Sequence, residues 1–202
     1  MDNKIILRPA QLIDADTLAR LWVETFPEKF GPIMGDNAEA IIYDWLRLSQ
    51  RHLQTTTLAT VDNVVVGFIS LETPTAPKPD DGRLLWHALR LHCSVFGAAK
   101  SVAKMALMDS DHKPNKDEVY IEMLGVDKNW RGRGVAKVLM HYAETVADEK
   151  NVRRLSLNVV RGNVAALNLY QDFGFTVEKE NKSRVLKWLT GYSGYYQMVK
   201  PL

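Results

Sequence analysis

The amino-acid sequence predicts an α/β fold in which helices flank a mixed central β-sheet. Three observations lead to this prediction: a short apolar run followed by a helical pattern, two β-rich runs separated by a turn dipeptide, and a strand–helix–strand–helix succession over residues 118–172. The two β-rich runs predict antiparallel pairing. The later succession brings two strands together in parallel through a crossover. A mixed sheet accounts for both.

The N-terminal segment is predicted to form a strand followed by a helix. Residues 4–7 are apolar enough for a short strand, and either Asp14 or Asp16 can cap the helix that follows. Apolar residues at helical spacing then continue to Trp22. A strand and a helix therefore open the domain.

A broken helical pattern and a hairpin come next. Prolines and glycines between residues 27 and 35 interrupt the pattern, which predicts a mobile loop before a second helix over Ala38–Leu53. Thr55–Val61 and Val64–Leu71 are rich in β-forming residues and flank the turn dipeptide Asp62-Asn63. We expect an antiparallel hairpin here.

Residues 74–117 resemble an insertion between the hairpin and the next strand. A polar, proline-rich stretch from Pro74 to Asp81 leads to one long amphipathic helix, predicted over Arg83–Met108. Residues 109–117 are polar again. The insertion is therefore expected to be helical.

The C-terminal half is predicted to hold alternating strands and helices. A glycine at position 174 is placed to end the second of these helices. The predicted elements are a strand over Glu118–Val126, a helix over Val135–Asp148, a strand over Arg154–Val160, a helix over Asn163–Asp172 and a last strand over Tyr195–Val199.

Composition limits the class of protein. The 202 residues predict a single domain over residues 1–202, and a net charge of +2 does not favour a nucleic-acid or membrane-surface partner. Cys93 is the only cysteine, which excludes a disulfide framework and a cysteine-rich metal site. No apolar run reaches the roughly 20 residues that a membrane-spanning helix needs. We expect a cytoplasmic protein without a metal.

A basic turn precedes the predicted helix that begins near Val135. Residues 127–134 contain two glycines and two arginines. Glycines allow close backbone approach, and the helix dipole places about half a positive charge at this end, so the turn is suited to a phosphate or pyrophosphate. An ordinary strand-to-helix turn with solvated arginines is the alternative.

The order of residues in this turn resembles that of a known family. Residues 131–136, Arg-Gly-Arg-Gly-Val-Ala, resemble the Arg/Gln-x-x-Gly-x-Gly/Ala motif of the GCN5-related N-acetyltransferase (GNAT) family. The run from Asn163 to Phe175 is similar to the family's Asn-x-x-Ala-x-x-x-Tyr-x-x-x-Gly-Phe run. The resemblance covers Glu118–Phe175 closely and leaves residues 74–117 uncovered.

The resemblance implies a GNAT fold and an acetyl-coenzyme A site. In such a fold two parallel strands, here residues 119–126 and 154–160, splay apart to admit the pantetheine arm, which pairs with the first strand like an added strand. Main-chain N–H groups of residues 131–136 would bind the pyrophosphate. The coenzyme-binding residues implied in this way are Leu124, Val126, Arg131, Gly132, Arg133, Gly134, Val135, Ala136, Asn158, Asn163, Ala166 and Tyr170.

Transfer of an acetyl group from a thioester to an amine requires a neutral amine and a proton for the departing thiol. The ordinary pKa of a lysine-type amine is about 10.4 and that of an α-amine about 7.7 to 8.0, so a base or a water relay must remove a proton. Glu122 is our choice for the base, and Glu118 and Asp117 are weaker alternatives. If Glu122 has no catalytic role, it is an ion-paired glutamate of the strand. Tyr170 matches the family's tyrosine near the coenzyme sulfur, where it would act as the acid; a core aromatic is its alternative.

The acceptor is expected to be the primary amine of a small molecule. By resemblance it would be bounded by Phe26–Gly35 and Asn181–Gly194, whose aromatic residues fit either an apolar acceptor or simple packing. The alternatives are a protein N-terminus or lysine as acceptor, and a non-catalytic acyl-coenzyme A sensor. We expect the helix at residues 83–108 to cover the acceptor cleft or a dimer interface, so a homodimer stays open.

Overall fold

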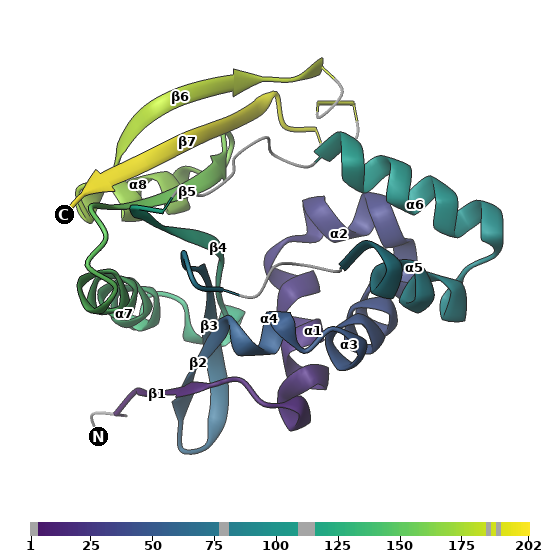
Figure 1. Cartoon of the computed structure of the whole chain (residues 1–202), viewed down its shortest axis with the longest axis horizontal. Helices are drawn as coiled ribbons and strands as arrows, with labels where there is room; N and C mark the ends of the chain where they lie inside the picture. Colours follow the sequence, from purple (N-terminus) through teal and green to yellow (C-terminus); the bar gives the residue numbers. More distant parts are fainter. Residues whose placement is uncertain (1–3, 77–80, 109–115, 185–186, 189–190) are drawn as a thin grey trace.

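The computed structural model of the chain describes residues 4–76, 81–108, 116–184, 187–188 and 191–202. Within these residues one sheet contains the strands β1 (Ile6–Pro9), β2 (Thr56–Val61), β3 (Val64–Glu72), β4 (Glu118–Val126), β5 (Arg154–Val160), β6 (Thr176–Lys182) and β7 (Gly194–Pro201). Their order is β1-β2-β3-β4-β5-β7-β6 (Figure 1). Among the described strands β4 and β5 pair in parallel and all other neighbours are antiparallel, which confirms the mixed sheet.

Helices cover both faces of the sheet. They are α1 (Ala15–Thr25), α2 (Pro27–Met34), α3 (Ala38–Leu48), α4 (Arg51–Gln54), α5 (Asp81–His92), α6 (Val95–Met108), α7 (Val135–Glu149) and α8 (Val164–Asp172), with 3-10 turns η1 (Leu12–Asp14), η2 (Gly35–Asn37) and η3 (Lys128–Trp130). Figure 1 shows α1 to α3, α5 and α6 grouped on one side, with α7 and α8 on the other. The order of elements agrees with the predicted α/β fold.

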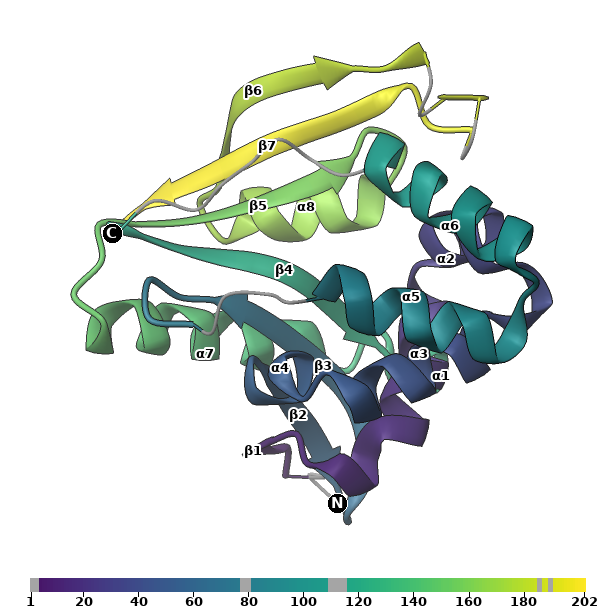
Figure 2. The ribbon, with the colours of Figure 1, turned by 45° about the vertical axis from the view of Figure 1, so that its right-hand side comes forward.

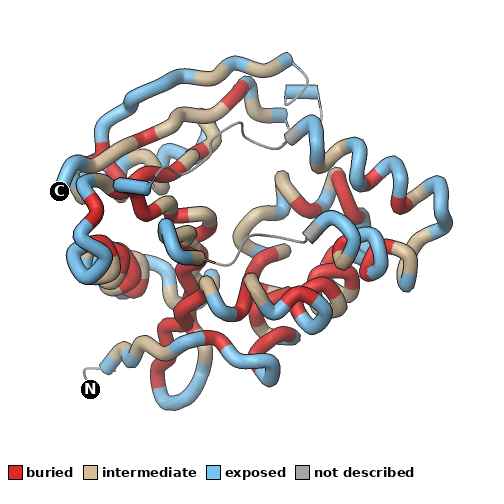
Figure 3. Tube along the Cα trace, in the orientation of Figure 1, coloured by how far each residue is buried: buried red, intermediate tan, exposed pale blue. Residues whose placement is uncertain are grey.

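Two apolar clusters hold these layers together. The first packs α1, α2, α3, α5 and α6 against side chains such as Leu58 and Phe68. The second packs α7 and α8 against the opposite face, where Ala59 and Ile69 point. Because neighbouring strand residues point to opposite faces, Leu58 and Ala59 belong to different clusters. Figure 3 shows buried residues concentrated on the central strands and on the inner sides of the helices.

The hairpin and the C-terminal alternation form as predicted. Asp62 and Asn63 both have positive φ, 49° and 63°, as a two-residue hairpin turn of the mirror-image type requires. The strands β4 and β5 have the predicted bounds. Gly174, with φ 85°, follows Phe173, the C-cap of α8. For these elements, residue pattern and turn chemistry were a sound guide to the structure.

The segment predicted as a mobile loop is helix α2, so that prediction was wrong. Pro27 occupies the first turn, where its missing N–H costs no hydrogen bond. Phe30 is buried, and its ring is stacked on that of Trp22 with the ring centres 6.1 Å apart. Packing of this apolar side against α1 outweighs the low helix propensity of the prolines and glycines.

The single long helix predicted over Arg83–Met108 is divided into α5 and α6. The break lies at Cys93 and Ser94. Ser94 Oγ accepts from the N–H of Gly97 at 3.1 Å, and Arg90 donates to the carbonyl of Cys93 at 2.6 Å, so both ends at the break have polar partners. Ser101 on α6 is buried and donates to the carbonyl of Ile33 at 2.6 Å.

Strand β6 was missed from the sequence. Six of its seven residues are exposed, so it shows no alternation of apolar and polar residues. It pairs along its length with β7 and forms the far edge of the sheet. Its charged side chains are typical of an edge strand that must avoid pairing with other chains.

Candidate active site

The parallel pair β4 and β5 opens into a V. Their register extends only from Glu118 opposite Arg154 to Ile121 opposite Leu157, although both strands continue beyond it. Figure 2 shows the two strands meeting near the C-terminus and diverging toward the helices. A splay of this kind was expected from the GNAT resemblance.

The main chain of β4 points into this gap. The N–H of Asp127 donates to the carbonyl of Val66 at 3.0 Å, which makes these two residues a hydrogen-bonded pair of the β3–β4 ladder. Bonded and non-bonded pairs alternate along antiparallel strands. Leu124 and Val126 therefore occupy non-bonded positions, and their N–H and C=O groups are directed away from β3. Arg131 Nε reaches the carbonyl of Val126 from that side at 3.3 Å.

The turn between β4 and α7 has the conformation that its glycines permit. Gly132 has φ 75° and Gly134 has φ 82°, and an added Cβ at either position would meet no atom within 4 Å. Gly134 is the N-cap of α7, and the first N–H that bonds back into the helix is that of Val138. The N–H groups of residues 135–137 are therefore available at the helix N-terminus. The space beside the two glycines is open to a ligand.

Arg133 stacks over Trp130 at one side of this turn. The guanidinium carbon lies 4.9 Å from the centre of the ring. Arg131, Gly132, Arg133 and Gly134 are all exposed. The positive charges of this turn thus stand at the surface, where an anion can reach them.

The residues predicted on β5 and α8 lie along the other arm of the V. Asn163 is the N-cap of α8, and its Oδ1 accepts from the N–H of Ala166 at 3.1 Å. Within the described residues, neither side-chain amide atom of Asn158 has a hydrogen-bond partner although both atoms are buried. A buried amide without partners is costly, so Asn158 is suited to meet a polar ligand.

Tyr170 lies in the second apolar cluster. Its side chain is buried beside Phe175, with ring centres 6.0 Å apart. Burial raises the pKa of its phenol to about 12. The phenol therefore keeps its proton throughout the neutral range and can act as a hydrogen-bond donor.

Glu122 occupies a β-bulge on β4. Ser70 and Leu71 are neighbours on β3, but their partners on β4 are Met123 and Ile121, which leaves Glu122 as the extra residue. Bulges redirect side chains, and Met123 joins the cluster on the α1 side. Glu122 is half-buried on the face opposite α7.

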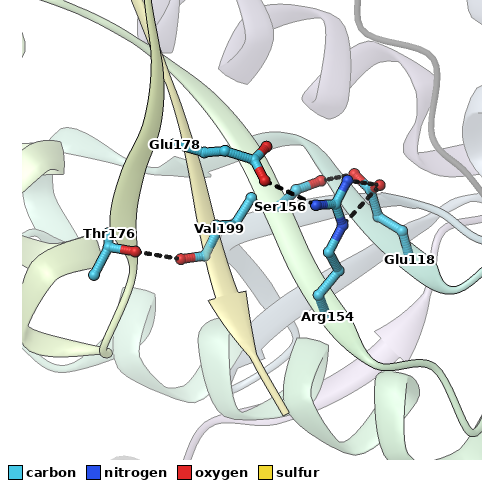
Figure 4. Close-up of polar contacts among 6 residues, drawn as sticks. All are labelled: Glu118, Arg154, Ser156, Thr176, Glu178 and Val199. Carbon is cyan, nitrogen blue, oxygen red and sulfur yellow. Dashed lines mark hydrogen bonds and ion pairs between the residues drawn. The ribbon is translucent and has the colours of Figure 1, made fainter.

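Glu118, a weaker alternative for the base, is committed to an ion pair at the closed end of the V (Figure 4). It is fully buried, and its carboxylate accepts from Arg154 at 2.9 Å and from Ser156. Arg154 also binds Glu178 on β6 at 3.0 Å. This network ties β4, β5 and β6 together.

Two residues that sequence reasoning missed lie beside Glu122. Glu72 ends β3, and Arg51 in α4 donates to its carboxylate. The predicted hairpin strand ended at Leu71 and the predicted linker began at Pro74, so Glu72 belonged to neither. The signal that could have found it is a glutamate that follows an apolar strand without a break.

The sequence profile of the acetyltransferase (GNAT) family matches residues 15–175. The chain belongs to this family. The matched range includes α1, the hairpin, both strands of the V, the turn before α7 and α8.

Individual GNAT relatives match shorter stretches. The L-amino acid N-acetyltransferase AaaT of Escherichia coli (strain K12) is 30% identical over 90 residues, which are 44% of this chain and 56% of the relative. N-alpha-acetyltransferase 30 of Saccharomyces cerevisiae is 31% identical over 83 residues, which are 41% of this chain and 45% of the relative. A probable spermine N(1)-acetyltransferase of Bacillus subtilis subsp. natto is 30% identical over 73 residues, 36% and 47%. The chain thus spans about half the length of the curated relatives that it matches.

Solved structures agree on the fold over nearly the whole chain. An N-acetyltransferase from Staphylococcus aureus Mu50 superposes with a TM-score of 0.68 at 20% identity, covering 96% of this chain and 100% of that one. The PaiA N-acetyltransferase from Thermoplasma acidophilum, in complex with coenzyme A, superposes with a TM-score of 0.61 at 17% identity, covering 98% of this chain and 99% of that one. At these identities the likeness shows the GNAT fold alone.

Other features of the described residues lie apart from the V. A cavity of about 240 Å³ lies on the α7 side, lined by residues that include Thr57, Thr73 and Tyr142, and none of the predicted site residues contributes to it. In the described ranges no helix is long and apolar enough to cross a membrane. Phe30, one of the aromatics expected around the acceptor, belongs to the first apolar cluster.

Proposed function

We propose that the chain is an acetyl-coenzyme A-dependent N-acetyltransferase that acetylates the primary amine of a small molecule by direct attack. The observation that carries the proposal is the position of Glu122 at a bulge beside the V, while the glycine turn lies at the end of the same strand. One strand therefore connects an anion-binding turn with a carboxylate at the reaction centre.

The coenzyme site in this proposal consists of the turn and both arms of the V. Acetyl-coenzyme A supplies the thioester. Residues 131–136 would hold its pyrophosphate through main-chain N–H groups. The outward-directed main-chain groups of Leu124 and Val126 would hold the pantetheine, with Asn158, Asn163 and Ala166 along the opposite arm.

Glu122 is proposed as the general base. It takes a proton from the amine, directly or through water, and the amine nitrogen then forms a bond to the thioester carbonyl carbon. The N–H of Leu124, which points into the gap, stabilises the negative charge on the carbonyl oxygen. Each of these groups belongs to β4.

Tyr170 is proposed to assist departure of the thiol. Its raised pKa, about 12, keeps the phenol protonated, so it donates a hydrogen bond to the sulfur as the carbon–sulfur bond breaks. The α8 position of Tyr170, on the β5 side of the V, fits a contact at the end of the pantetheine.

The similar proteins support more than one acceptor class. Their names include an L-amino acid, spermine and protein α-amine acetyltransferase. We favour a small amine; a peptide N-terminus is the second candidate because of the likeness to N-alpha-acetyltransferase 30. A cytoplasmic location belongs to the same proposal, since one cysteine fits a reducing compartment and acetyl-coenzyme A is its donor.

The test is an amine screen that monitors release of free thiol from acetyl-coenzyme A. It includes amino acids, polyamines, aminoglycosides and N-terminal peptides, with mass spectrometry of each acetylated product. The wild-type protein should accelerate thiol release with at least one small amine. Glu122→Gln should lower kcat/KM by about 100-fold or more while binding of acetyl-coenzyme A is retained.

The outcomes separate the candidates. Acetylation of peptides alone would replace the small-molecule proposal by a protein acceptor. Coenzyme binding without transfer to any amine would contradict an enzymatic role and leave the sensor alternative.

A further inference from the structure

The antiparallel pair β3 and β4 brings a second carboxyl group next to Glu122. Glu72 lies directly opposite Tyr120 on β4, and Tyr120 is two residues before Glu122 in the sequence. Ser70 and Glu72 share one face of β3, and Glu122 with Met123 at the bulge opposes Ser70. The carboxyl groups of Glu72 and Glu122 therefore extend from neighbouring strands on the same face of the sheet.

Two basic residues of α4 face this carboxyl pair. Arg51 forms an ion pair with Glu72, and the guanidinium side chain is only 10% exposed. His52 follows it and is buried, with its ring centre 4.5 Å from that of Trp45 and 5.5 Å from that of Trp22. Trp22 belongs to α1 and Trp45 to α3, so these ring contacts pack α4 against the two helices, next to the residue that binds Glu72.

The charges of Glu72 and Glu122 act on each other. The pKa of Glu72 is raised, first by burial and then by the charge of Glu122, while Arg51 and His52 oppose the rise. The Coulomb energy of a pair belongs to both members, so the charge of Glu72 opposes ionisation of Glu122 as well. Arg51 has the opposite effect on Glu72, because its positive charge lowers the pKa of that carboxyl group.

The remaining charged groups around this face form a separate network. Glu118 precedes Tyr120 on the same face of β4 and is bound by Arg154 of β5. The helix α1 contacts this region through uncharged side chains: Trp22 packs on Phe68, and Thr25 lies next to Gly125. Among the residues that the structure describes, the titratable and charged groups on this face besides Glu122 are Glu72, Arg51, His52, Glu118, Tyr120 and Arg154.

We propose that Glu72, held by Arg51, is a positioning residue for Glu122, and that this pair sets the pH at which Glu122 becomes able to accept a proton. Glu72 keeps the base strong enough to take a proton from an ammonium group, and Arg51 keeps it ionised near neutral pH. The inference rests on the proposed function, because it concerns the base of that reaction.

The experiment measures kcat/KM against pH with an amine found in the screen. Glu72→Gln removes a negative charge and leaves Arg51 in place. The acidic limb of the kcat/KM profile, where activity rises with pH, should therefore move to lower pH by about one unit. Arg51→Gln leaves two carboxyl groups without their cation, so the limb should move to higher pH. Arg51→Lys keeps the charge and should restore the wild-type limb.

Two controls isolate the effect. Glu180→Gln removes the same charge from β6, where β5 and β7 separate it from β4, and should leave the limb unmoved. A second amine of different pKa should give the same shifts, because the titrating group belongs to the protein. Thermal melting of each variant checks folding, and the Arg51 variants decide the question if Glu72→Gln does not fold.

Each outcome bears on a different claim. Opposite shifts for Glu72→Gln and Arg51→Gln support the inference. Coincident profiles for an active wild type and both variants overturn it and leave the proposed function intact. Absence of amine-dependent thiol release by the wild-type protein overturns the proposed function and this inference together.

Discussion

At the scale of single residues, burial determines what each candidate side chain can do. Tyr170 is enclosed by apolar neighbours, and burial raises the pKa of its phenol to about 12. The side-chain amide of Asn158 has no hydrogen-bond partner among the described residues, whereas Asn163 uses its Oδ1 to cap α8. Two asparagines on the same arm of the V therefore differ in what their side chains can bind.

Tyr170→Phe should lower turnover by about tenfold or more, because it removes the phenol that is proposed to donate to the departing sulfur. The ring keeps its packing, so affinity for acetyl-coenzyme A should not change. Steady-state kinetics and calorimetry measure the two effects separately. Tyr142→Phe is the matched control, since its hydroxyl bonds to Thr57 outside the site and turnover should be unaffected. Equal turnover for both variants would reject the role of Tyr170.

Sequence motifs located residues whose conformation is set locally. Gly132 and Gly134, which the turn motif singled out, have positive φ, and Glu122 lies beside the V. Glu72 and Arg51 were not found, because their pairing joins residues 21 positions apart on different elements. A contact of this kind depends on the register of β3 and on the packing of α4, which no local pattern displays.

At the scale of elements, the V depends on its closed end. The β4–β5 register stops after Ile121, and the buried carboxylate of Glu118 is held by Arg154 where the strands still pair. A buried charge that loses its partner is strongly destabilising. The ion pair therefore contributes to holding the two arms together at one end only.

Arg154→Met should lower the free energy of unfolding by about 3 to 5 kcal/mol, because it removes the cation that faces the fully buried Glu118. Glu178→Gln removes a partner of the same arginine whose side chain is 42% exposed, and should cost less than about 1 kcal/mol. Urea denaturation of both variants gives the comparison. Equal losses would show that burial of Glu118 is not the source of the effect.

The insertion is an integral part of the first apolar cluster. Leu89 on α5 is fully buried there, whereas Phe96 at the start of α6 is 81% exposed. Leu89→Ala should therefore lower the free energy of unfolding by about 2 to 5 kcal/mol. Phe96→Ala should change it by no more than about 0.5 kcal/mol. Similar values for the two variants in denaturant titrations would contradict this packing.

Elements with a regular pattern in their own residues were predictable, whereas those fixed by contacts with other elements were not. The alternation of apolar and polar residues located β5 with its correct bounds, and β4 also has the predicted bounds. The exposed edge strand β6 has no such pattern, and in α2 the contact of Phe30 with Trp22 overrides the local effect of proline and glycine. The break between α5 and α6 depends on Ser94 and Arg90, whose capping bonds a helical periodicity does not reveal.

At the scale of the whole molecule, the sheet separates two layers that serve different parts of the proposed reaction. The layer with α7 and α8 carries the glycine turn and Tyr170, and the layer with α1 to α6 faces Glu122 and Glu72. The V connects the two layers. A donor bound from one side and an amine arriving from the other would therefore meet at β4.

The most direct test of this account is calorimetric titration of acetyl-coenzyme A into the wild-type protein, Gly134→Val and Gly31→Val. Neither added side chain meets a protein atom at Cβ, but only Gly134 has positive φ and lies at the N-terminus of α7. The account predicts saturable binding to the wild-type protein and to Gly31→Val, and affinity reduced by about tenfold or more for a folded Gly134→Val. No binding to the wild-type protein at millimolar coenzyme, or equal affinity for all three, would contradict it.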